Sequence, residues 1–189
     1  MNIKNAVGAF YQPILVYSNY SVLNSLPIAD IKNGVVEILV HAIIKDYELF
    51  SFIENNMDKI LSLESEIMEN LILKNCYIKK CVVEIDEKET GERAILNFGH
   101  TFGHAFESYY NYEYKHGECV AAGILGACYL AENLEMIDHT SVKRIQNIMV
   151  KLGVLRDFRG CEWEQIWDYL RCDKKRVSGK ICFILPVAI

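Results

Sequence analysis

The chain has 189 residues, of which 51% are hydrophobic, 11% aromatic and 24% charged, a balance that describes a globular protein with one well-buried core. Its formal net charge of -5 provides no basic field for a phosphate backbone, which argues against nucleic acid as a partner. The seven cysteines are odd in number and form no C-x-x-C pair, and no apolar run reaches the roughly 18 residues of a membrane span. We therefore expect free thiols in a cytoplasmic protein.

The hydrophobic pattern predicts a mainly α fold, a multihelical single domain over residues 1–189 with minor strand at its two ends. Residues 14–17 are β-branched or aromatic and favour one short strand, and the last ten residues, KICFILPVAI, favour another. Pro27 lies near the start of the first helix. Helices are predicted at 27–43, 47–54, 58–85, 94–109, 117–133, 141–152 and 162–171, with a charged loop at 86–92 and a break of the third helix allowed near Asn75 or at Val82 and Val83.

The segment 93–118, RAILNFGHTFGHAFESYYNYEYKHGE, contains three histidines. His100 and His104 are one helical turn apart, and His116 precedes the next predicted helix, so the three imidazoles could form a metal site. Arg93 and Asn97 continue the same face of the predicted helix backwards at i, i+4 spacing. A metal, a guanidinium and an amide that face one pocket suit a small anionic, polyhydroxylated substrate.

A catalytic zinc takes about three protein ligands and keeps one position open. His100 and His116 are candidate ligands, and Glu37 is the candidate carboxylate because it interrupts the apolar helix face GVVEILVHAII. His41, one turn after Glu37, is a rival that spacing does not exclude. The alternative reading is ordinary: helix glutamates usually reach solvent, and H-x-x-x-H pairs also occur as surface or core residues.

Several charged residues have a second reading as well. Lys79, Lys174 and Lys175 are candidate phosphate or carboxylate contacts, but on pattern alone each is better explained as a solvated lysine. Arg93 has a stronger claim because its planar fork suits a carboxylate. Glu118 either orients a metal ligand from behind or is a helix N-terminal charge that interacts favourably with the dipole.

From KNAVGAFYQP at Lys4 to its last residue, the chain resembles the C-terminal region of the 3-dehydroquinate synthases. Family members carry R-x-x-L-N-x-G-H-[TS]-x-G-H-A followed by H-G-E-x-V-A-x-G. This chain has RAILNFGHTFGHA at 93–105 and HGECVAAG at 116–123, and DEKETGER at 86–93 and DKK at 173–175 also match family segments. Resemblance over nearly the full length makes coincidence implausible.

The resemblance implies a metal, Zn²⁺ or Co²⁺, and NAD as cofactors. The family's metal ligands fall on Glu37, His100 and His116, whereas His41 falls on a position where the family varies. On the cofactor side, Lys4 falls on a lysine near the NAD, and Asn5 beside it falls on a substrate-contacting position. The other family substrate contacts fall on Lys79, Arg93, Asn97, His104 and, in the D-K-K segment, Lys174.

The family reaction converts 3-deoxy-D-arabino-heptulosonate 7-phosphate, a phosphorylated sugar acid, to 3-dehydroquinate and phosphate in the shikimate pathway of aromatic amino-acid biosynthesis. The resemblance implies oxidation by NAD of a hydroxyl held on the zinc, loss of phosphate, reduction of the ketone, ring opening and an intramolecular aldol closure. Arg93 and Asn97 would fix the substrate carboxylate.

Two departures from the family limit what the resemblance implies. Family members begin with a nucleotide-binding α/β domain, but this chain has no G-x-G-x-x-G after a strand, so we expect it to be inactive without a separate NAD-binding domain. The full family enzyme is commonly a homodimer. The chain also reads EILV at 37–40 where the family has E-[VL]-[IV]-K, and Val40 thus replaces a lysine. Loss of one charge-assisted contact costs about 1.5–3 kcal/mol, which predicts weakened or altered catalysis.

Two other functions compete with this one. A 2-deoxy-scyllo-inosose synthase runs similar chemistry on glucose 6-phosphate, which has no carboxylate, so Arg93 and Asn97 argue for the carboxylate-bearing substrate. A non-catalytic remnant that binds a metal or a partner through an exposed domain face is favoured by Val40 and by the missing domain. The retained ligand and substrate positions oppose it.

Overall fold

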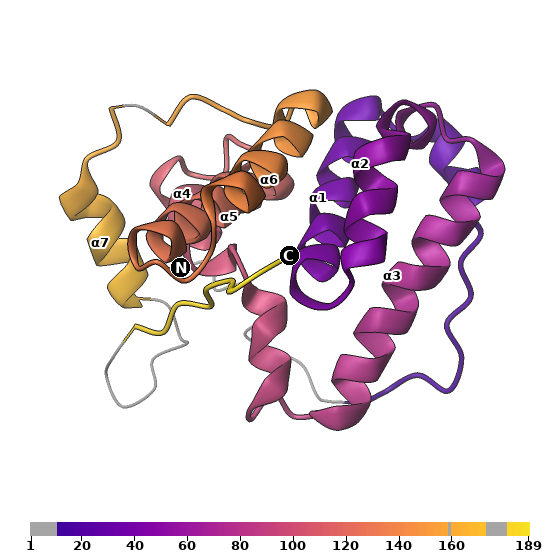
Figure 1. Ribbon diagram of the computed structural model, residues 1–189, viewed down its shortest axis with the longest axis horizontal. Coiled ribbons are helices and arrows are strands. Elements are labelled where there is room, and N and C mark those ends of the chain that lie inside the picture. Colours follow the sequence, from indigo (N-terminus) through magenta and orange to yellow (C-terminus); the bar gives the residue numbers. More distant parts are fainter. Residues whose placement is uncertain (1–10, 159, 173–180) are drawn as a thin grey trace.

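The computed structural model describes residues 11–158, 160–172 and 181–189, and every regular element in these ranges is helical. Helices α1 to α3 form one group and α4 to α7 the other, and α1 packs against α5 where the two groups meet (Figure 1). The predicted mainly α fold is thereby confirmed. The 3-10 helices are η1 (Tyr20–Ser25) and η2 (Glu92–Asn97), and the α-helices are α1 (Ile28–Lys45), α2 (Tyr47–Leu61), α3 (Ser65–Ile85), α4 (His100–Tyr109), α5 (His116–Asn133), α6 (His139–Leu152) and α7 (Trp163–Cys172).

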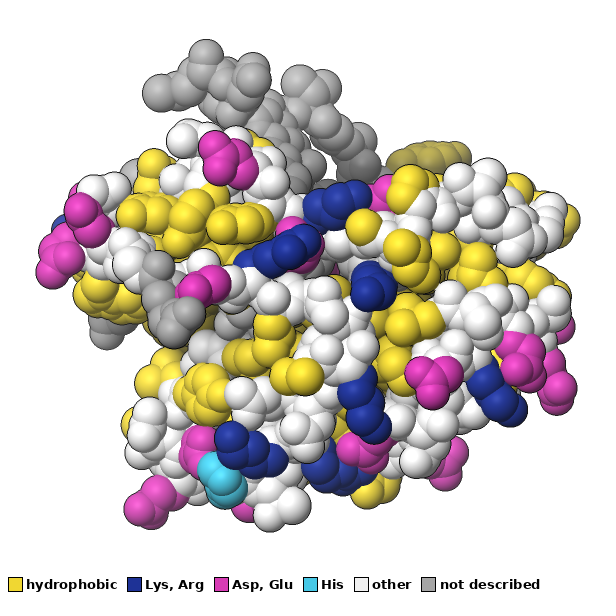
Figure 2. Space-filling view, turned by 90° about the horizontal axis from the view of Figure 1, so that it is seen from above, with side chains coloured by type: hydrophobic (Ala, Val, Ile, Leu, Met, Phe, Trp, Pro, Cys, Tyr) yellow, Lys and Arg dark blue, Asp and Glu magenta, His cyan; other side chains and the backbone are white. Residues whose placement is uncertain are grey.

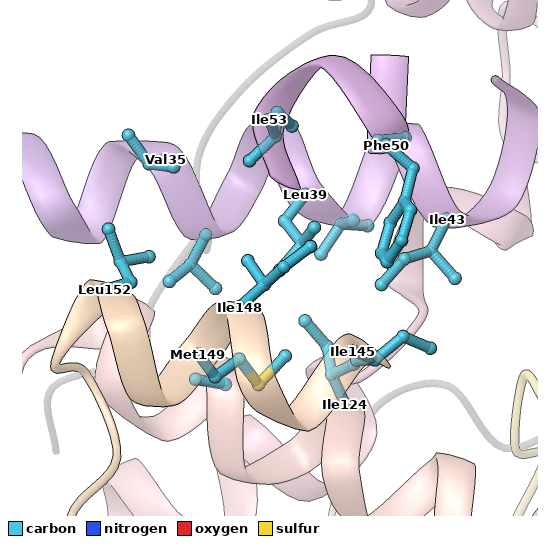
Figure 3. Packing of buried hydrophobic residues seen from close by; sticks show 14 of the residues in the cluster. Val35, Leu39, Ile43, Phe50, Ile53, Ile124, Ile145, Ile148, Met149 and Leu152 are labelled. Carbon is cyan, nitrogen blue, oxygen red and sulfur yellow. The ribbon is translucent and has the colours of Figure 1, made fainter. Parts of the chain in front are cut away.

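The main hydrophobic core lies between α1, α2, α5 and α6 (Figure 3). On α1, Val35, Leu39 and Ile43 recur every four residues and are at most 3% exposed, so they form one buried stripe. Full burial of each such side chain stabilises the fold by about 1.5–3 kcal/mol. The core therefore fixes the orientation of α1. The residues that pack with this stripe include Phe50, Ile53, Ile124, Ile145, Ile148, Met149 and Leu152.

A second, smaller cluster attaches α7 and the C-terminal segment to α4. Ala105 of α4 and Ile166 and Leu170 of α7 are its buried members. Phe102 of α4 stacks on Phe183 of the C-terminal segment with ring centroids 4.7 Å apart. This packing gives α4 a second set of contacts besides those with α5, and α4 carries two of the three histidines of the sequence motif.

The predicted strands at the two ends are wrong for the described residues. Residues 14–17 are irregular and exposed, with Ile14 fully accessible, and residues 181–189 form no regular element. A strand needs a neighbour for its N–H and C=O groups, and no described segment supplies one. The apolar C-terminal residues are instead explained by helix contacts, because Ile184 and Leu185 are partly buried against the main core. Lys180 lies outside the described residues.

The boundary between the second and third helices was predicted only in part. Asp46 caps α2, its carboxylate accepting a hydrogen bond from Leu49 N at 2.9 Å. The expected gap between 54 and 58 coincides with a kink at Asn56, whose φ is -119° and ψ 19°, but α2 continues past this kink to Leu61. The chain then turns through Leu63, whose φ is 57°, before α3 begins at Ser65. This turn contains no glycine or proline, so the predicted helix 58–85 joined the end of α2 to α3. Helix α3 runs without a break past Asn75.

A further correction concerns the predicted helix 94–109, which is two elements. Helix η2 ends at Asn97, and α4 begins at His100 after Gly99, whose φ is 75°. A Cβ on Gly99 would lie 2.5 Å from Cγ1 of Ile124, so only glycine allows this turn against α5. Asn97 and His100 consequently do not share one helix face.

The surface carries side chains of both charges interspersed with hydrophobic ones, as the face in Figure 2 shows. Within the described part of the chain, no helix combines the length and apolarity that crossing a bilayer requires. The cysteines whose side chains are described are free thiols, as expected, and burial raises the pKa of Cys119 and of Cys128 to about 12.

Substitution of Gly123 by alanine should force α4 away from α5. An added Cβ would lie 2.0 Å from the carbonyl oxygen of Gly99 and 2.8 Å from the backbone nitrogen of Gly103, and backbone atoms cannot rotate away. We expect Gly123→Ala to lower the free energy of unfolding by about 3 kcal/mol in urea titrations, the upper end of the usual cost of overpacking.

The matched control is Gly126→Ala, one turn further along α5. The nearest atom to its Cβ would belong to the Phe102 ring, at an ordinary contact distance of 3.4 Å, and alanine favours a helix over glycine by about 1 kcal/mol. If the two variants proved equally stable, the backbone contact between α4 and α5 would not be the constraint described.

Candidate metal centre

Three side chains from three helices converge at one point. Glu37 comes from the middle of α1, His100 is the first residue of α4, and His116 is the first residue of α5. Oε1 of Glu37 lies 3.4 Å from Nε2 of His100 and 3.2 Å from Nε2 of His116. The ligand atoms all lie within 4.8 Å of one another, close enough to bind one ion. The structure thus brings together the three residues predicted as metal ligands.

One oxygen in this group lacks a hydrogen-bond partner. Oε1 of Glu37 is buried, and neither imidazole approach has hydrogen-bond geometry, so no described residue satisfies it. Leaving a buried acceptor unpaired costs about 1–3 kcal/mol, and more when the group is charged. A cation shared with His100 and His116 would remove that cost. One carboxylate and two imidazoles also match the donors of catalytic zinc sites, so the residues fit a metal ion.

The ionisation of these groups is strongly coupled. Burial alone would raise the pKa of Glu37, but interaction with His100 and His116 outweighs it and lowers the pKa far below its ordinary value. Hydrogen bonding to Glu107, together with the nearby negative carboxylate of Glu37, raises the pKa of His116 to about 9. A negative carboxylate therefore lies beside a positive imidazolium, and a bound cation would supply the same positive charge.

Each of the two histidines is held from behind by its other ring nitrogen. Nδ1 of His100 lies 3.0 Å from the carbonyl oxygen of Phe98, at the turn that begins α4. Nδ1 of His116 lies 2.8 Å from Oε1 of Glu107. Both rings therefore present Nε2 towards Glu37. The sequence reasoning missed Glu107; its one signal was an acidic residue two turns after His100 on a helix that becomes buried.

His104 lies beside this group. Its ring is stacked on that of His116, with centroids 5.8 Å apart, and is edge-on to that of His100 at 5.6 Å. His104, Glu107 and His116 also have ligand atoms close together, but Nδ1 of His116 already bonds Glu107. The unpaired oxygen of Glu37 is on the other side, so the observations favour a metal there. The role of His104 as a substrate contact stays a prediction.

Arg93 and Asn97 are held by the loop that precedes them. Nη1 of Arg93 donates to the carbonyl oxygen of Glu87 at 2.7 Å, and Nδ2 of Asn97 donates to Oε1 of Glu89 at 2.8 Å. Asp86 organises the loop by accepting hydrogen bonds from the backbone nitrogens of its last residues. Glu89 was missed in the sequence, because its contact with Asn97 depends on how the loop folds back.

The remaining predicted residues have different surroundings. Lys79 is exposed on α3. His41 is buried with Nδ1 2.6 Å from Oδ1 of Asn75, and it is not in the group of ligand atoms around Glu37, which argues against it as the rival ligand. Burial lowers the pKa of His41, and Lys79 lowers it further. Val40 is fully buried in the main core. The predicted residues Lys4, Asn5, Lys174 and Lys175 lie outside the described residues.

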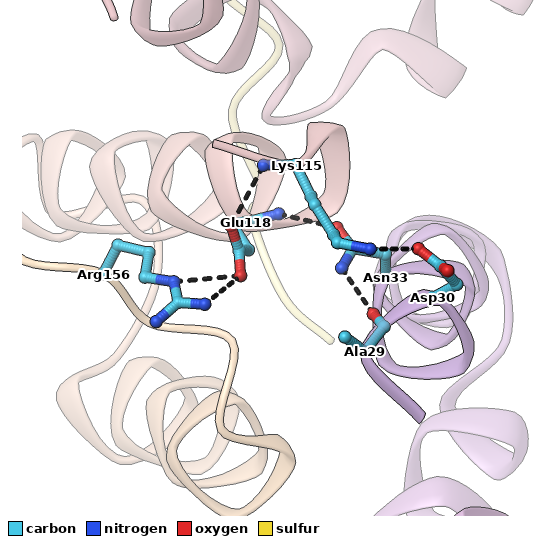
Figure 4. Close-up of polar contacts among 6 residues, drawn as sticks. All are labelled: Ala29, Asp30, Asn33, Lys115, Glu118 and Arg156. Carbon is cyan, nitrogen blue, oxygen red and sulfur yellow. Dashed lines mark hydrogen bonds and ion pairs between the residues drawn. The ribbon is translucent and has the colours of Figure 1, made fainter. Parts of the chain in front are cut away.

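Glu118 proves to be a helix cap that joins α5 to its neighbours (Figure 4). Its Oε2 accepts a hydrogen bond from Lys115 N at 3.0 Å, and its Oε1 accepts two from Arg156 at 2.9 and 2.6 Å. Its backbone nitrogen donates to Oδ1 of Asn33 on α1 at 3.2 Å, and Lys115 forms an ion pair with Asp30. Of its two readings, the helix N-terminal charge is the one supported. Because Asn33 lies one turn before Glu37, these bonds set α1 against the start of α5.

With this geometry, the chain was compared with known proteins. The family model for the 3-dehydroquinate synthase C-terminal region matches residues 34–176. The chain belongs to this family. It is 44% identical over 183 residues to 3-dehydroquinate synthase of Acetivibrio thermocellus, covering 97% of this chain and 51% of that protein. It is 45% identical over 184 residues to that of Thermoanaerobacter sp., covering 97% and 52%. The chain thus spans about half the length of the curated relatives it matches.

Solved structures share the fold. A 2-epi-5-epi-valiolone synthase from Streptomyces hygroscopicus subsp. jinggangensis, with NAD⁺ and Zn²⁺ bound, superposes with a TM-score of 0.89 over 98% of this chain and 52% of that one, at 22% identity. A 2-deoxy-scyllo-inosose synthase complexed with carbaglucose-6-phosphate, NAD⁺ and Co²⁺ superposes with a TM-score of 0.82 over 98% and 52%, at 27% identity. The helical arrangement is therefore found in about half of each of these two structures.

The loop that holds Arg93 and Asn97 should lose stability in acid through Asp86. Hydrogen bonds, first from the backbone of Thr90, lower the pKa of Asp86 from 3.8 to about 2. Its contribution is therefore complete above pH 3.8 and is lost as the pH falls through about 2. We expect Asp86→Asn to lower the thermal unfolding midpoint at neutral pH, and the difference from the unsubstituted chain to vanish between about pH 4 and pH 2.

Midpoints measured in steps of pH would check this. The control is Glu87→Gln, which alters a neighbouring exposed carboxylate and leaves the bonds of Asp86 in place. A difference between Asp86→Asn and the unsubstituted chain that stayed constant over the whole pH range would contradict the assignment.

Proposed function

We propose that this chain forms the metal- and substrate-binding part of a 3-dehydroquinate synthase, which converts 3-deoxy-D-arabino-heptulosonate 7-phosphate to 3-dehydroquinate and phosphate. Family membership supports the proposal, and so does the unpaired buried oxygen of Glu37 between two imidazole nitrogens. A separate N-terminal domain would bind most of the NAD, since the relatives are about twice as long as this chain. The homodimer and the cytoplasmic location stay predictions.

The protein groups have distinct tasks in this proposal. Glu37, His100 and His116 would hold Zn²⁺ or Co²⁺, which supplies Lewis-acid polarisation of a substrate hydroxyl, and NAD supplies hydride transfer. Asn97 already donates to a carboxylate, that of Glu89, so its amide is suited to a carboxylate of the substrate. The planar, positively charged guanidinium group of Arg93 lies four residues earlier in the sequence. Together they would anchor the substrate acid group while His104 lies next to the metal ligands.

A second candidate is a cyclase whose substrate has no carboxylate. The likeness to the 2-deoxy-scyllo-inosose synthase that binds carbaglucose-6-phosphate favours it, at 27% identity and a TM-score of 0.82. The higher identity to 3-dehydroquinate synthases, 44 to 45%, favours the sugar acid. Phosphate release from the heptulosonate phosphate compared with glucose 6-phosphate would separate the two.

Metal binding tests the centre without any need for catalysis. We expect the purified chain to bind one equivalent of Zn²⁺ or Co²⁺, measured by competition with a chromogenic chelator. Loss of a ligand should cost at least as much affinity as loss of a supporting group, for which about 10–100-fold is usual, so Glu37→Gln should bind on the order of a hundredfold more weakly. His41→Gln is the control, because this histidine is adjacent on α1 yet bonds Asn75. Equal affinity in the two variants would refute the assignment of Glu37.

Reconstitution tests the activity. We expect no phosphate release from the chain alone with NAD, metal and heptulosonate phosphate, and release when a separately produced N-terminal half of a related synthase is added. In that mixture Arg93→Lys should lower kcat/KM roughly ten- to a hundredfold, because the planar fork loses about 1.5–3 kcal/mol of charge-assisted contact.

The outcomes of reconstitution are distinct. Turnover by the chain alone would refute the need for a second domain. Metal binding without activity in the mixture would favour the non-catalytic remnant, and neither metal binding nor activity would remove the site assignment altogether. Turnover of glucose 6-phosphate in place of the heptulosonate phosphate would support the second candidate.

A further inference from the structure

A second buried carboxylate stands behind the metal centre. Glu107 of α4 is 6% exposed, and its Oε1 lies 2.8 Å from Nδ1 of His116 on α5. A carboxylate that is taken out of water costs several kcal/mol unless it is paired and hydrogen-bonded. Glu107 is nevertheless buried, and it lies beside His116, a proposed metal ligand. Packing alone does not explain a carboxylate at this position.

The chemistry of the pair fixes the orientation of the ring. An ionised carboxylate can only accept hydrogen bonds, so Nδ1 of His116 must be the nitrogen that carries a proton. A metal would therefore displace the proton on Nε2, which lies 3.2 Å from Oε1 of Glu37, and bind the lone pair left there. The hydrogen bond to Glu107 therefore selects both the tautomer and the direction of the ring.

The two histidines differ in what stands behind them. The partner of His100 is the neutral carbonyl oxygen of Phe98, whereas that of His116 is a carboxylate. With Glu37, the centre then has two negative side chains, which balance the two charges of a divalent ion in a partly buried site where electrostatic interactions are stronger than in water. Glu107 also lies two turns after His100 on the same helix, so α4 supplies one ligand and the support of the other.

We propose that Glu107 is the positioning residue of the metal centre: it holds His116 as the Nδ1–H tautomer with Nε2 directed at the metal, and its negative charge strengthens binding of a divalent ion. The inference rests on the metal site of the proposed function. Glu107 acts through His116 and does not itself coordinate, because its Oε1 is bonded to Nδ1 on the side of the ring away from Glu37.

Two substitutions separate the charge of Glu107 from its hydrogen bond. In Glu107→Gln the amide oxygen can still accept from Nδ1–H, so the ring stays oriented and only the charge is lost. In Glu107→Ala both are lost. We expect the dissociation constant for Zn²⁺ and Co²⁺, from chelator competition, to rise about 10-fold for Gln and about 100-fold for Ala, the range seen for supporting groups of metal ligands. The Co²⁺ absorption bands should keep their shape in the Gln variant and change in the Ala variant.

A merely structural role for Glu107 is excluded by a double substitution. In the background His116→Ala, the change Glu107→Gln should have no further effect on residual metal affinity, because the ring through which it acts is gone. Glu113→Gln is the matched surface control, since Glu113 is exposed and only six residues further on. The thermal midpoint of each variant reports whether it folds, and if Glu107→Ala does not fold, the Gln variant and the double substitution decide the question.

The results distinguish this inference from the proposed function. If the unsubstituted chain binds metal, and both Glu107→Gln and Glu107→Ala bind it with the same affinity as the unsubstituted chain, the positioning role is refuted and the metal site stands. An effect of Glu107→Gln that is unchanged in the His116→Ala background would also refute it. If the unsubstituted chain binds neither metal, both the metal site and the role of Glu107 are refuted.

Discussion

The backbones of α4 and α5 meet at Gly99 and Gly123 with no side chain between them, and the candidate metal centre depends on this contact. His100 directly follows Gly99, so the turn after η2 also determines the position of the His100 side chain. The same close approach places Glu107 of α4 within hydrogen-bond distance of His116 on α5. The positions of His100 and His116, and of Glu107 behind His116, thus follow from a contact between main chains. Such a contact varies less than a contact between flexible side chains.

The third ligand position is set by a different kind of interaction. Helix α1 is fixed by the apolar stripe that includes Leu39 and, at its start, by the hydrogen bond from Glu118 N to Asn33. Glu37 lies between these two attachments, and its Oε1 is buried although its side chain as a whole is 39% exposed. Packing elsewhere in α1 therefore offsets the cost of an unpaired buried oxygen. A site that is held in this way does not need to rearrange when a cation binds.

The sequence predicted what depends on local pattern and missed what depends on tertiary contacts. The helices at 117–133 and 141–152 agree with α5 and α6 to within two residues, because each has a continuous apolar stripe. The turn at Leu63 and the left-handed Gly99 were missed, since the first has no turn residue and the second is required only by Ile124 on another helix. In the site, Glu37 was found as an acidic residue on an apolar face. Glu107 and Glu89 were not found, because their partners are defined only once the chain has folded.

The arrangement separates metal binding from catalysis in physical terms. All three candidate ligands, the carbonyl behind His100 and the carboxylate behind His116 lie within the part of the chain that the structure describes. If hydride transfer needs NAD from another domain, the two processes have separate structural requirements, and each can be lost without the other. Val40 illustrates this: it is fully buried one turn after Glu37, so an apolar residue there maintains the packing of α1 and hence the ligand geometry, whatever contact with substrate a lysine would have made. Selection on the metal centre and selection on substrate binding can therefore act on neighbouring residues of one helix with different results.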